Sequence, residues 1–228
     1  MSLAGTGAVA IWHDLLPEAK SDFYEWHNRE HMPERVGIPG FRRGRRYIAI
    51  SGTPEFFNLY EADTPEVLGG RDYLDRLNAP TPWTARVVPS FRNVARSICR
   101  VAFSRGVGSG GVMLTACFDV DAAHRAFAMA ALSTKILPPL ALRVGIAGVH
   151  LCLADEAVSN VETAEKRARS DSTRVPTSIV LIEGIGRAEV EATAEELLPV
   201  LHQHHAHAIE IAVYRHEFTR LKTPQTAG

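Results

Sequence analysis

Short apolar runs alternate along the chain with longer stretches of helical periodicity, and this alternation predicts its secondary structure. In the first half, apolar runs bounded by Gly, Pro and Asp predict strands, and amphipathic stretches that start near Pro or Thr predict helices. The predicted elements are a strand at 8–12, a helix at 17–35, strands at 41–51 and 55–62, a helix at 64–78 and a strand at 93–103. The order is β-α-β-β-α-β.

The second half repeats this order, which predicts one fold occurring twice. Its elements are a strand at 110–120, a helix at 121–137, strands at 148–154 and 177–186, a helix at 189–204 and a strand at 208–218. The segments VGIPG (36–40) and VGIAG (144–148) match at corresponding helix-to-strand joints. We therefore expect two repeats, 1–105 and 106–228. A polar, charged segment near 156–175 predicts an exposed insertion in the second repeat.

This order predicts an α+β fold class. A β-α-β-β-α-β unit is the ferredoxin-like arrangement, in which an antiparallel sheet carries both helices on one face. The other face of each sheet must also be covered. A chain with two such units can pack them sheet to sheet, giving a dimeric α/β-barrel-type fold within one chain.

The composition is that of an ordinary globular protein and does not indicate a specific function. Hydrophobic residues make up 46% of the 228 residues and charged residues 22%, as in ordinary globular domains. The net charge of −1 gives no electrostatic reason to expect nucleic acid as a partner. No apolar run is long enough for a membrane span. Three dispersed cysteines, Cys99, Cys117 and Cys152, favour core thiols in a reducing compartment, so we expect a cytoplasmic protein.

The side chains best suited to catalysis or ligand binding lie on the first predicted helix, in the sequence WHNREH (26–31). HNREH fits the inverted zinc-peptidase pattern H-x-x-E-H, but no third ligand and no suitable fold accompany it, so we expect no metal there. On a helical wheel, the apolar face with Phe23 and Trp26 also carries polar groups, while Met32 falls on the far side. The polar groups on this face are His27, Glu30, His31 and Glu34. Titratable groups beside aromatics on a buried face indicate a candidate site.

The two glutamates have an alternative, structural reading. The next predicted strand carries Arg45 and Arg46, which can neutralise Glu30 and Glu34 as buried ion pairs. The helix of the second half, 121–137, has only His124 as a comparable group. We therefore expect any site to belong to the first half.

The run WHNREHMPERVGIPGFRRGRRY resembles the EthD-type branch of the dimeric α/β-barrel superfamily over about the first 100 residues. The matching positions are Trp26, Glu30, His31, Pro33, Glu34, Arg35, Pro39, Gly40, Phe41, Arg46 and Tyr47. The resemblance implies small-molecule pockets between sheet and helices. Its relatives include cofactor-free monooxygenases, isomerases, polyketide cyclases and haem-degrading enzymes.

By this resemblance, we expect an enzyme that acts on a small aromatic or polyketide-like molecule by histidine acid/base chemistry without a cofactor. The expected catalytic residues are His31, His27 and Tyr47, and the expected substrate-binding residues are Trp26, Tyr24, Phe23 and His13. A homodimer is a further expectation. The rival hypothesis is a non-catalytic binding or assembly protein in which the histidines, glutamates and arginines form a structural cluster.

Three other signals are weaker. The histidines of HQHHAH (202–207) are capable of binding a metal, but their irregular spacing is more typical of a solvated surface. The glycine-rich stretch 104–111 lacks the GK[ST] ending of a phosphate-binding loop and predicts a linker. Haem ligation by a single histidine is the remaining cofactor alternative.

Overall fold

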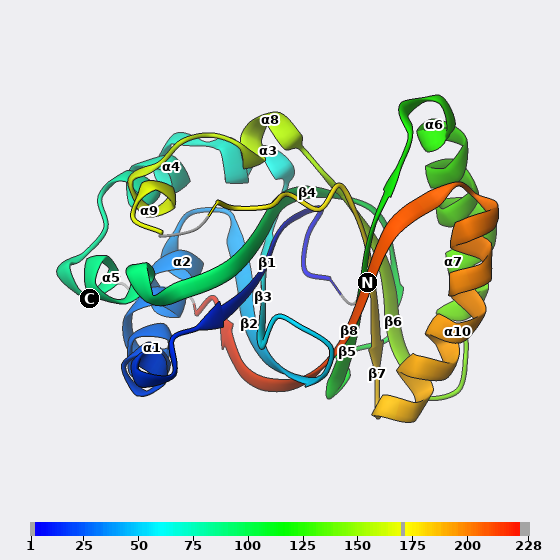
Figure 1. Ribbon diagram of the computed structural model, residues 1–228, viewed down its shortest axis with the longest axis horizontal. Coiled ribbons are helices and arrows are strands. Elements are labelled where there is room, and N and C mark those ends of the chain that lie inside the picture. Colours follow the sequence, from blue (N-terminus) through cyan, green and yellow to red (C-terminus); the bar gives the residue numbers. More distant parts are fainter. Residues whose placement is uncertain (1–2, 170–171, 224–228) are drawn as a thin grey trace.

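The strands of the computed structural model close into one antiparallel barrel; residues 3–169 and 172–223 are described. The barrel lies in the middle of the molecule (Figure 1). Its strands are β1 (Gly7–Leu15), β2 (Phe41–Ser51), β3 (Phe56–Ala62), β4 (Phe91–Gly106), β5 (Val112–Val120), β6 (Ile146–Ala154), β7 (Ser178–Gly184) and β8 (Ala206–Leu221). The predicted strands are all present, and β4 and β8 extend beyond their predicted ends.

The strand order joins the two halves edge to edge. Around the barrel it reads β1-β3-β2-β8-β5-β7-β6-β4, so each half contributes four neighbouring strands. The antiparallel pairs β2–β8 and β4–β6 connect one half to the other and close the barrel. Closure leaves no exposed sheet edge.

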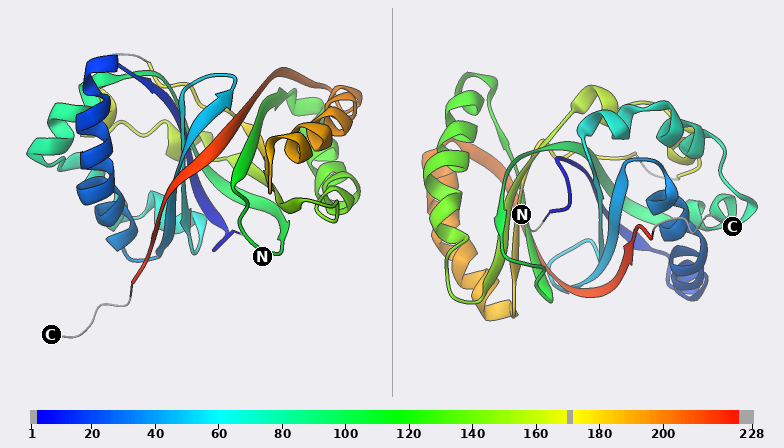
Figure 2. Two further views of the ribbon diagram at one scale, coloured as in Figure 1. Left: turned by 90° about the horizontal axis from the view of Figure 1, so that it is seen from below. Right: turned by 180° about the vertical axis from the view of Figure 1, so that it is seen from behind.

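Helices cover the barrel on two opposite sides (Figures 1 and 2). One layer holds the helices of the first half together with α8 and α9, and the other holds α6, α7 and α10. The bounds are α1 (Lys20–Trp26), α2 (Met32–Gly37), α3 (Pro65–Gly69), α4 (Arg71–Asn78), α5 (Pro82–Val87), α6 (Ala122–Ala131), α7 (Leu137–Leu140), α8 (Glu156–Ser159), α9 (Ala164–Arg167) and α10 (Arg187–Gln203). None of the helices in the described part of the chain has the length and hydropathy needed to cross a membrane.

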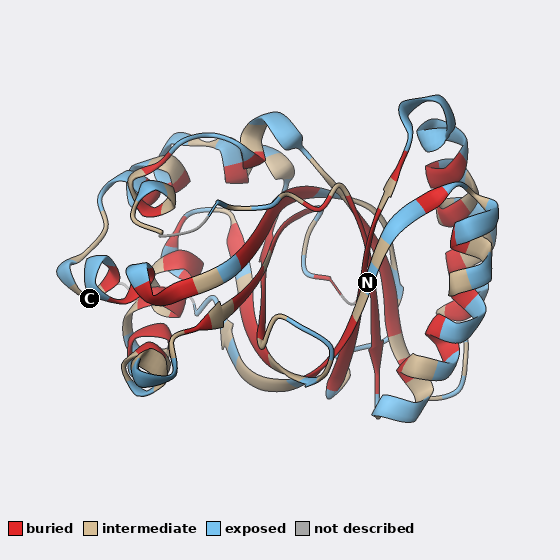
Figure 3. Ribbon diagram, viewed as in Figure 1, coloured by how far each residue is buried: buried red, intermediate tan, exposed pale blue. Residues whose placement is uncertain are grey.

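Side chains fill the inside of the barrel, and strands β1, β3, β5, β6 and β7 are buried along most of their length (Figure 3). An aromatic group of Trp12, Tyr47, Phe57 and Tyr214 packs there with the three free cysteines. The interior is thus a packed core, and the predicted core position of the cysteines is confirmed.

The first helix of each half contains a π-helical turn. These turns are His27–His31, between α1 and α2, and Leu132–Ile136, between α6 and α7. The following strands begin directly after Gly40 (φ 83°) and Gly145 (φ 80°), where a positive φ favours glycine. The pairing of VGIPG with VGIAG predicted Gly148 as the counterpart of Gly40, and the structure places Gly145 there instead.

The segment near 156–175, predicted as an exposed insertion, is only partly exposed where it carries α8 and α9. We call residues 156–169 the strap. It crosses to the first-half helices, where α9 packs on α4, and the side chains of Ser159, Thr163 and Glu165 are buried. The strap therefore combines buried polar contacts on one side with solvent-exposed polar residues such as Glu156 and Glu162 on the other.

Candidate functional site

The π-helical turn His27–His31 sets which side chains of the first helix face the sheet. A π turn takes one residue more than an α turn, so it rotates every later residue relative to an ideal wheel. Met32, predicted on the far side, is fully buried, and Arg35 is buried as well. His27 and His31 also face the sheet, as predicted, and their exposed fractions are 2% and 8%.

Both ring nitrogens of His27 are engaged. Arg46 Nη1 lies 3.1 Å from Nδ1, and Tyr60 Oη lies 3.2 Å from Nε2. Because a guanidinium can only donate, Nδ1 accepts and Nε2–H donates to the tyrosine oxygen. Burial, and then the charge of Arg46, hold the pKa of His27 well below its ordinary value. His27 is therefore a neutral ring whose lone pair is already in use.

His31 differs from His27 in having a free nitrogen. Its Nδ1 is buried and has no hydrogen-bond partner among the described residues. The ring lies 4.2 Å from that of Trp26 and 5.6 Å from that of His27. Burial, with Arg35 as the next cause, keeps the pKa of His31 well below its ordinary value. A buried, neutral, unpartnered imidazole is an unusual arrangement and indicates a functional group.

A small cavity of about 40 Å³ adjoins His27 and His31, enough for about three water molecules. Arg35, Tyr60 and Arg96 contribute polar groups to its wall, and Glu165 and Arg169 do so from the strap. The remaining lining residues are Ile11, Trp26, Asn58, Tyr73, Leu77, Val88 and Phe91.

Of the predicted substrate-binding residues, only Trp26 lines this cavity. His13 and Phe23 are buried behind it, where their rings pack at 5.4 Å. His13 Nε2 accepts from Asn58 Nδ2 at 3.0 Å, and burial lowers the pKa of His13 to about 3. Tyr24 lies half-buried and donates to Glu217 at 3.3 Å. His13, Phe23 and Tyr24 thus support the site from behind rather than facing its cavity.

The predicted catalytic partner Tyr47 is on the wrong side of the sheet. Successive residues of a strand face opposite sides, and Tyr47 points into the barrel, whereas Arg46 points toward the helix layer. Tyr60, on β3, takes the place expected for Tyr47 beside the histidines. Burial raises the pKa of Tyr60 well above its ordinary value, so its hydroxyl remains protonated.

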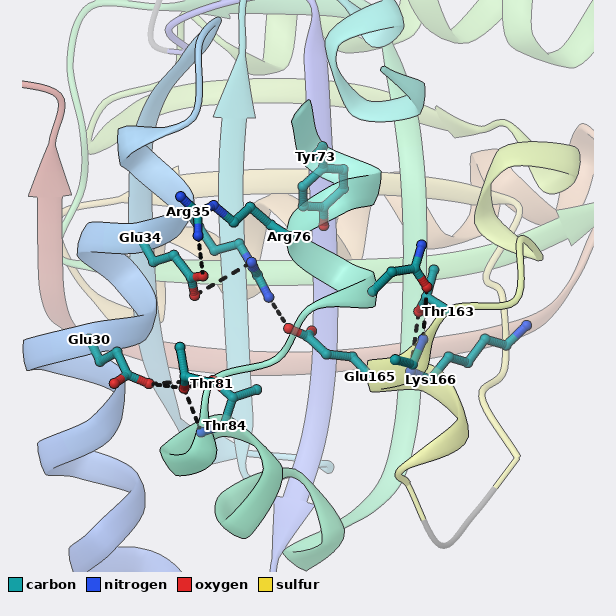
Figure 4. A network of polar contacts seen from close by, with 12 residues as sticks. Glu30, Glu34, Arg35, Tyr73, Arg76, Thr81, Thr84, Thr163, Glu165 and Lys166 are labelled. Carbon is teal, nitrogen blue, oxygen red and sulfur yellow. Dashed lines mark hydrogen bonds and ion pairs between the residues drawn. The ribbon is translucent and has the colours of Figure 1, made fainter. Parts of the chain in front are cut away.

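The predicted ion pairs between the helix glutamates and the β2 arginines do not form. Glu30 accepts a hydrogen bond from Thr81 and forms no ion pair within the described residues (Figure 4). Glu34 pairs instead with Arg35 at 3.6 Å and with Arg76 at 3.7 Å. The turn that buries Arg35 brings this arginine, and no residue of β2, to Glu34.

The two β2 arginines have partners in the second half of the chain. Arg46 donates to Glu217 of β8 at 3.1 Å, outside the barrel wall. Arg45 points inward, where it pairs with Glu183 at 2.9 Å and with Glu61 at 3.0 Å. Both arginines do form buried ion pairs, but with carboxylates of the strands rather than with the predicted helix glutamates.

Seven polar residues around the cavity were not predicted from the sequence. They are Tyr60, Tyr73, Arg96, Glu165, Arg169, Arg35 and Asn58. The first three come from segments interpreted only as core strands and a surface helix, although Tyr60 and Arg96 interrupt apolar runs with polar groups. Glu165 and Arg169 lie in the strap, so the site is not confined to the first half as expected.

The histidines of HQHHAH, predicted to lie on a solvated surface, have metal binding as their weaker alternative. No group of three or more His, Cys, Asp or Glu side chains suited to a metal ion occurs within residues 3–169 and 172–223. His205 stacks on His124 with ring centroids 3.8 Å apart. Two stacked rings are too few for a typical protein metal site.

Comparison with solved structures identifies the fold. The chain superposes on an anthrone oxidase-like protein with a TM-score of 0.66 at 12% identity, covering 100% of this chain and 98% of that one. The chain has the dimeric α/β-barrel fold. A proposed monooxygenase from Lactobacillus acidophilus NCFM matches with a TM-score of 0.58 at 9% identity over 95% and 96% of the two chains.

A heme-binding protein from Thermus thermophilus shares the same fold. It matches with a TM-score of 0.50 at 9% identity over 94% of this chain and 92% of that one. The sequence itself matches no protein-family model and no curated protein. At these identities, the neighbours establish the fold alone. The reaction has to be inferred from the residues of the site.

The cavity beside His31 is too small for a haem in the observed arrangement. The cavity beside His31 has a volume of about 40 Å³, whereas even drug-sized ligands occupy pockets of about 300 Å³ or more. On the other side of the barrel, the space between helices and sheet is filled by an aliphatic cluster that includes Leu132, Val149 and Leu197. As observed, neither of these two spaces is large enough for a porphyrin.

Proposed function

We propose that the chain is a cofactor-independent enzyme, of monooxygenase, cyclase or isomerase type, acting on a small aromatic or polyketide-like molecule. The observation that carries this proposal is the buried, unpartnered Nδ1 of His31 at the cavity. A neutral imidazole with a free lone pair can remove a proton from a substrate without a metal. The anthrone oxidase-like and proposed monooxygenase neighbours support this class of chemistry.

Three residues have distinct roles in the proposed reaction. His31 acts as the general base, because it alone of the two helix histidines has a free nitrogen. Tyr60 accepts a hydrogen bond from His27, which leaves its own proton available for a substrate oxygen. A carbon acid next to a carbonyl would lose its proton to His31, and the enolate oxygen formed would be stabilised by Tyr60. His27 orients Tyr60 and does not itself transfer a proton.

The low pKa of His31 restricts the substrate. A weak base removes protons efficiently only from an acidic carbon or a phenol, because proton transfer is most effective when the two pKa values are close. Carbons activated by both a carbonyl and an aromatic ring satisfy this condition. A ring system does not fit into about 40 Å³, so entry requires the strap to move outward.

The small size of the cavity also favours the rival function, a non-catalytic protein with a structural polar cluster. Turnover of anthrone in air, followed by oxygen consumption and by the absorbance of the quinone product, distinguishes the two. We expect His31→Gln to lower kcat about 100-fold or more, the usual contribution of a general base. Tyr47→Phe, inside the barrel, is the matched control and should retain activity. No turnover of anthrone by the wild type would reject the monooxygenase form of the proposal, and unchanged turnover in His31→Gln would reject His31 as the general base.

For the origin of the fold, we propose two ferredoxin-like repeats and kinship with the EthD-type branch. The strand orders β4-β1-β3-β2 and β8-β5-β7-β6 support the repeat, and so do the two π turns at corresponding positions. The EthD-type assignment rests on the motif of the first helix alone.

A further inference from the structure

Positive charge exceeds negative charge at the cavity beside His31. Three arginines line it, Arg35, Arg96 and Arg169, against one carboxylate, Glu165. Glu165 is already engaged, because it forms a buried ion pair with Arg35. Glu34, the other carboxylate near Arg35, is shared with Arg76.

Two of the three arginines have no carboxylate partner. The side chain of Arg96 is buried and donates to Tyr73 Oη at 3.1 Å, and Arg169 donates to Thr173 at 3.2 Å. Neither forms an ion pair with any residue in the described ranges. Buried charges in proteins are normally paired, so the buried Arg96 and the partly buried Arg169 both lack an expected carboxylate partner.

The positive charges of Arg96 and Arg169 repel each other. Burial, followed by the charge of Arg96, lowers the pKa of Arg169 to about 10. The unpartnered Nδ1 of His31 lies in the same wall as a further polar atom without a partner. Arginine carries a planar fork of donors that matches the two oxygens of a carboxylate, and it can also donate to the single oxygen of an enolate.

We infer that the cavity is an anion-binding subsite, in which Arg96 and Arg169 hold the carboxylate or ionised enol group of the substrate beside His31. This inference rests on the proposed function and narrows its substrate class to acidic molecules. In this inference, Arg96 and Arg169 bind and orient the substrate next to His31. An anion bound there would offset the charge of Arg169, which adds to burial and to the charge of Arg35 in lowering the pKa of His31.

The test uses acetate and acetamide, which have the same shape, differ in charge and are small enough for a cavity the size of about three waters. Binding to the full-length protein is followed by NMR through the arginine Nε–Hε resonances. We expect acetate to bind at least tenfold more tightly than acetamide. Arg96→Gln and Arg169→Gln should each weaken acetate binding about tenfold or more, since a charge-assisted pair is lost.

Arg100→Gln is the matched control, because Arg100 is exposed and lies on the same strand and face as Arg96. It should leave acetate binding unchanged. If acetamide binds as well as acetate, if neither binds, or if Arg100→Gln weakens acetate as much as the other two variants, the subsite is refuted. Circular dichroism spectra show whether each variant is folded. Because Arg96 and Arg169 are substituted separately, the test remains valid if one of the two variants misfolds.

This experiment is separable from the test of the enzymatic proposal, because it measures equilibrium binding without turnover. Acetate binding that depends on Arg96, together with unchanged turnover in His31→Gln, would retain the subsite and reject the general base. Loss of turnover in His31→Gln with no preference for the anion would do the reverse.

Discussion

Tyr47 and Tyr60 lie on neighbouring strands and face opposite sides of the barrel wall, so the same residue type has two different roles. Tyr60 hydrogen-bonds His27 beside the cavity. The hydroxyl of Tyr47 is buried inside the barrel without a hydrogen-bond partner among the described residues. An unsatisfied buried hydroxyl costs free energy, whereas a satisfied one contributes to stability.

This contrast predicts opposite effects of one substitution. We expect Tyr47→Phe to leave the free energy of unfolding unchanged or to raise it by about 1 kcal/mol, because it removes an unsatisfied polar group. Tyr60→Phe should lower it by about 1 kcal/mol or more, because it leaves Nε2–H of His27 unpaired. Urea denaturation at neutral pH measures both. Equal losses in the two variants would show that the Tyr47 hydroxyl has a partner in solution.

At the scale of elements, the strap joins the two halves at the site. Its Glu165 pairs with Arg35, a buried contact between residues 130 positions apart in the sequence (Figure 4). The backbone of Ala164 donates to the side chain of Asn78 at 3.1 Å, which fixes α9 on α4. The strap is therefore held by a few polar contacts rather than by a large apolar face, and such segments open at low cost.

We expect Glu165→Gln to release the strap. Removing one charge of a buried pair typically costs about 3 kcal/mol or more, which corresponds to at least a 100-fold increase in opening. Amide hydrogen exchange in residues 158–167 should accelerate by this factor, while the strands of the barrel keep their protection. Glu162→Gln is the control, because Glu162 is exposed and pairs only with Lys166 at the surface. If exchange in the strap is the same in both variants, the ion pair does not hold it.

Element order was predictable from the sequence, and the residues of the site were only partly so. Apolar runs of strand length and amphipathic helices are local patterns, so the β-α-β-β-α-β order and the burial of His27 and His31 followed from them. The π turn is not visible in such a pattern, because an ideal helical wheel places Met32 outside and Arg35 out of reach. The contacts of Glu165 and Arg169 depend on how a polar segment crosses to the other half, which no local signal specifies.

At the scale of the whole molecule, three buried neutral histidines make stability depend on pH. His13, His27 and His31 all have pKa values below their ordinary value, with His13 at about 3. The unfolded chain binds protons at these residues near pH 6.5 and the folded chain does not. Stability is therefore fully present above pH 6.5 and is lost as the pH falls below it.

We expect the free energy of unfolding to fall with a slope that approaches about 4 kcal/mol per pH unit near pH 5, about 1.4 for each histidine. His31→Gln should reduce this slope by about one third, whatever its effect at pH 7. Urea titrations at pH 7, 6 and 5.5 measure the slope. The control is His202→Gln, at an exposed position, which should leave the slope unchanged. A slope that His31→Gln does not alter would mean that His31 is protonated in the folded state.

The strap has one more consequence for the molecule. When two identical chains build a barrel of this kind, symmetry gives both halves the same helix layer, and any change to one site is copied to the other. Here a single chain carries both halves, so the second half packs aliphatic side chains under its own helices and sends a connecting segment across to enclose the other half's histidines. Joining the halves covalently thus permits them to differ, so that one half carries the histidine cluster and the other supplies the segment that covers it.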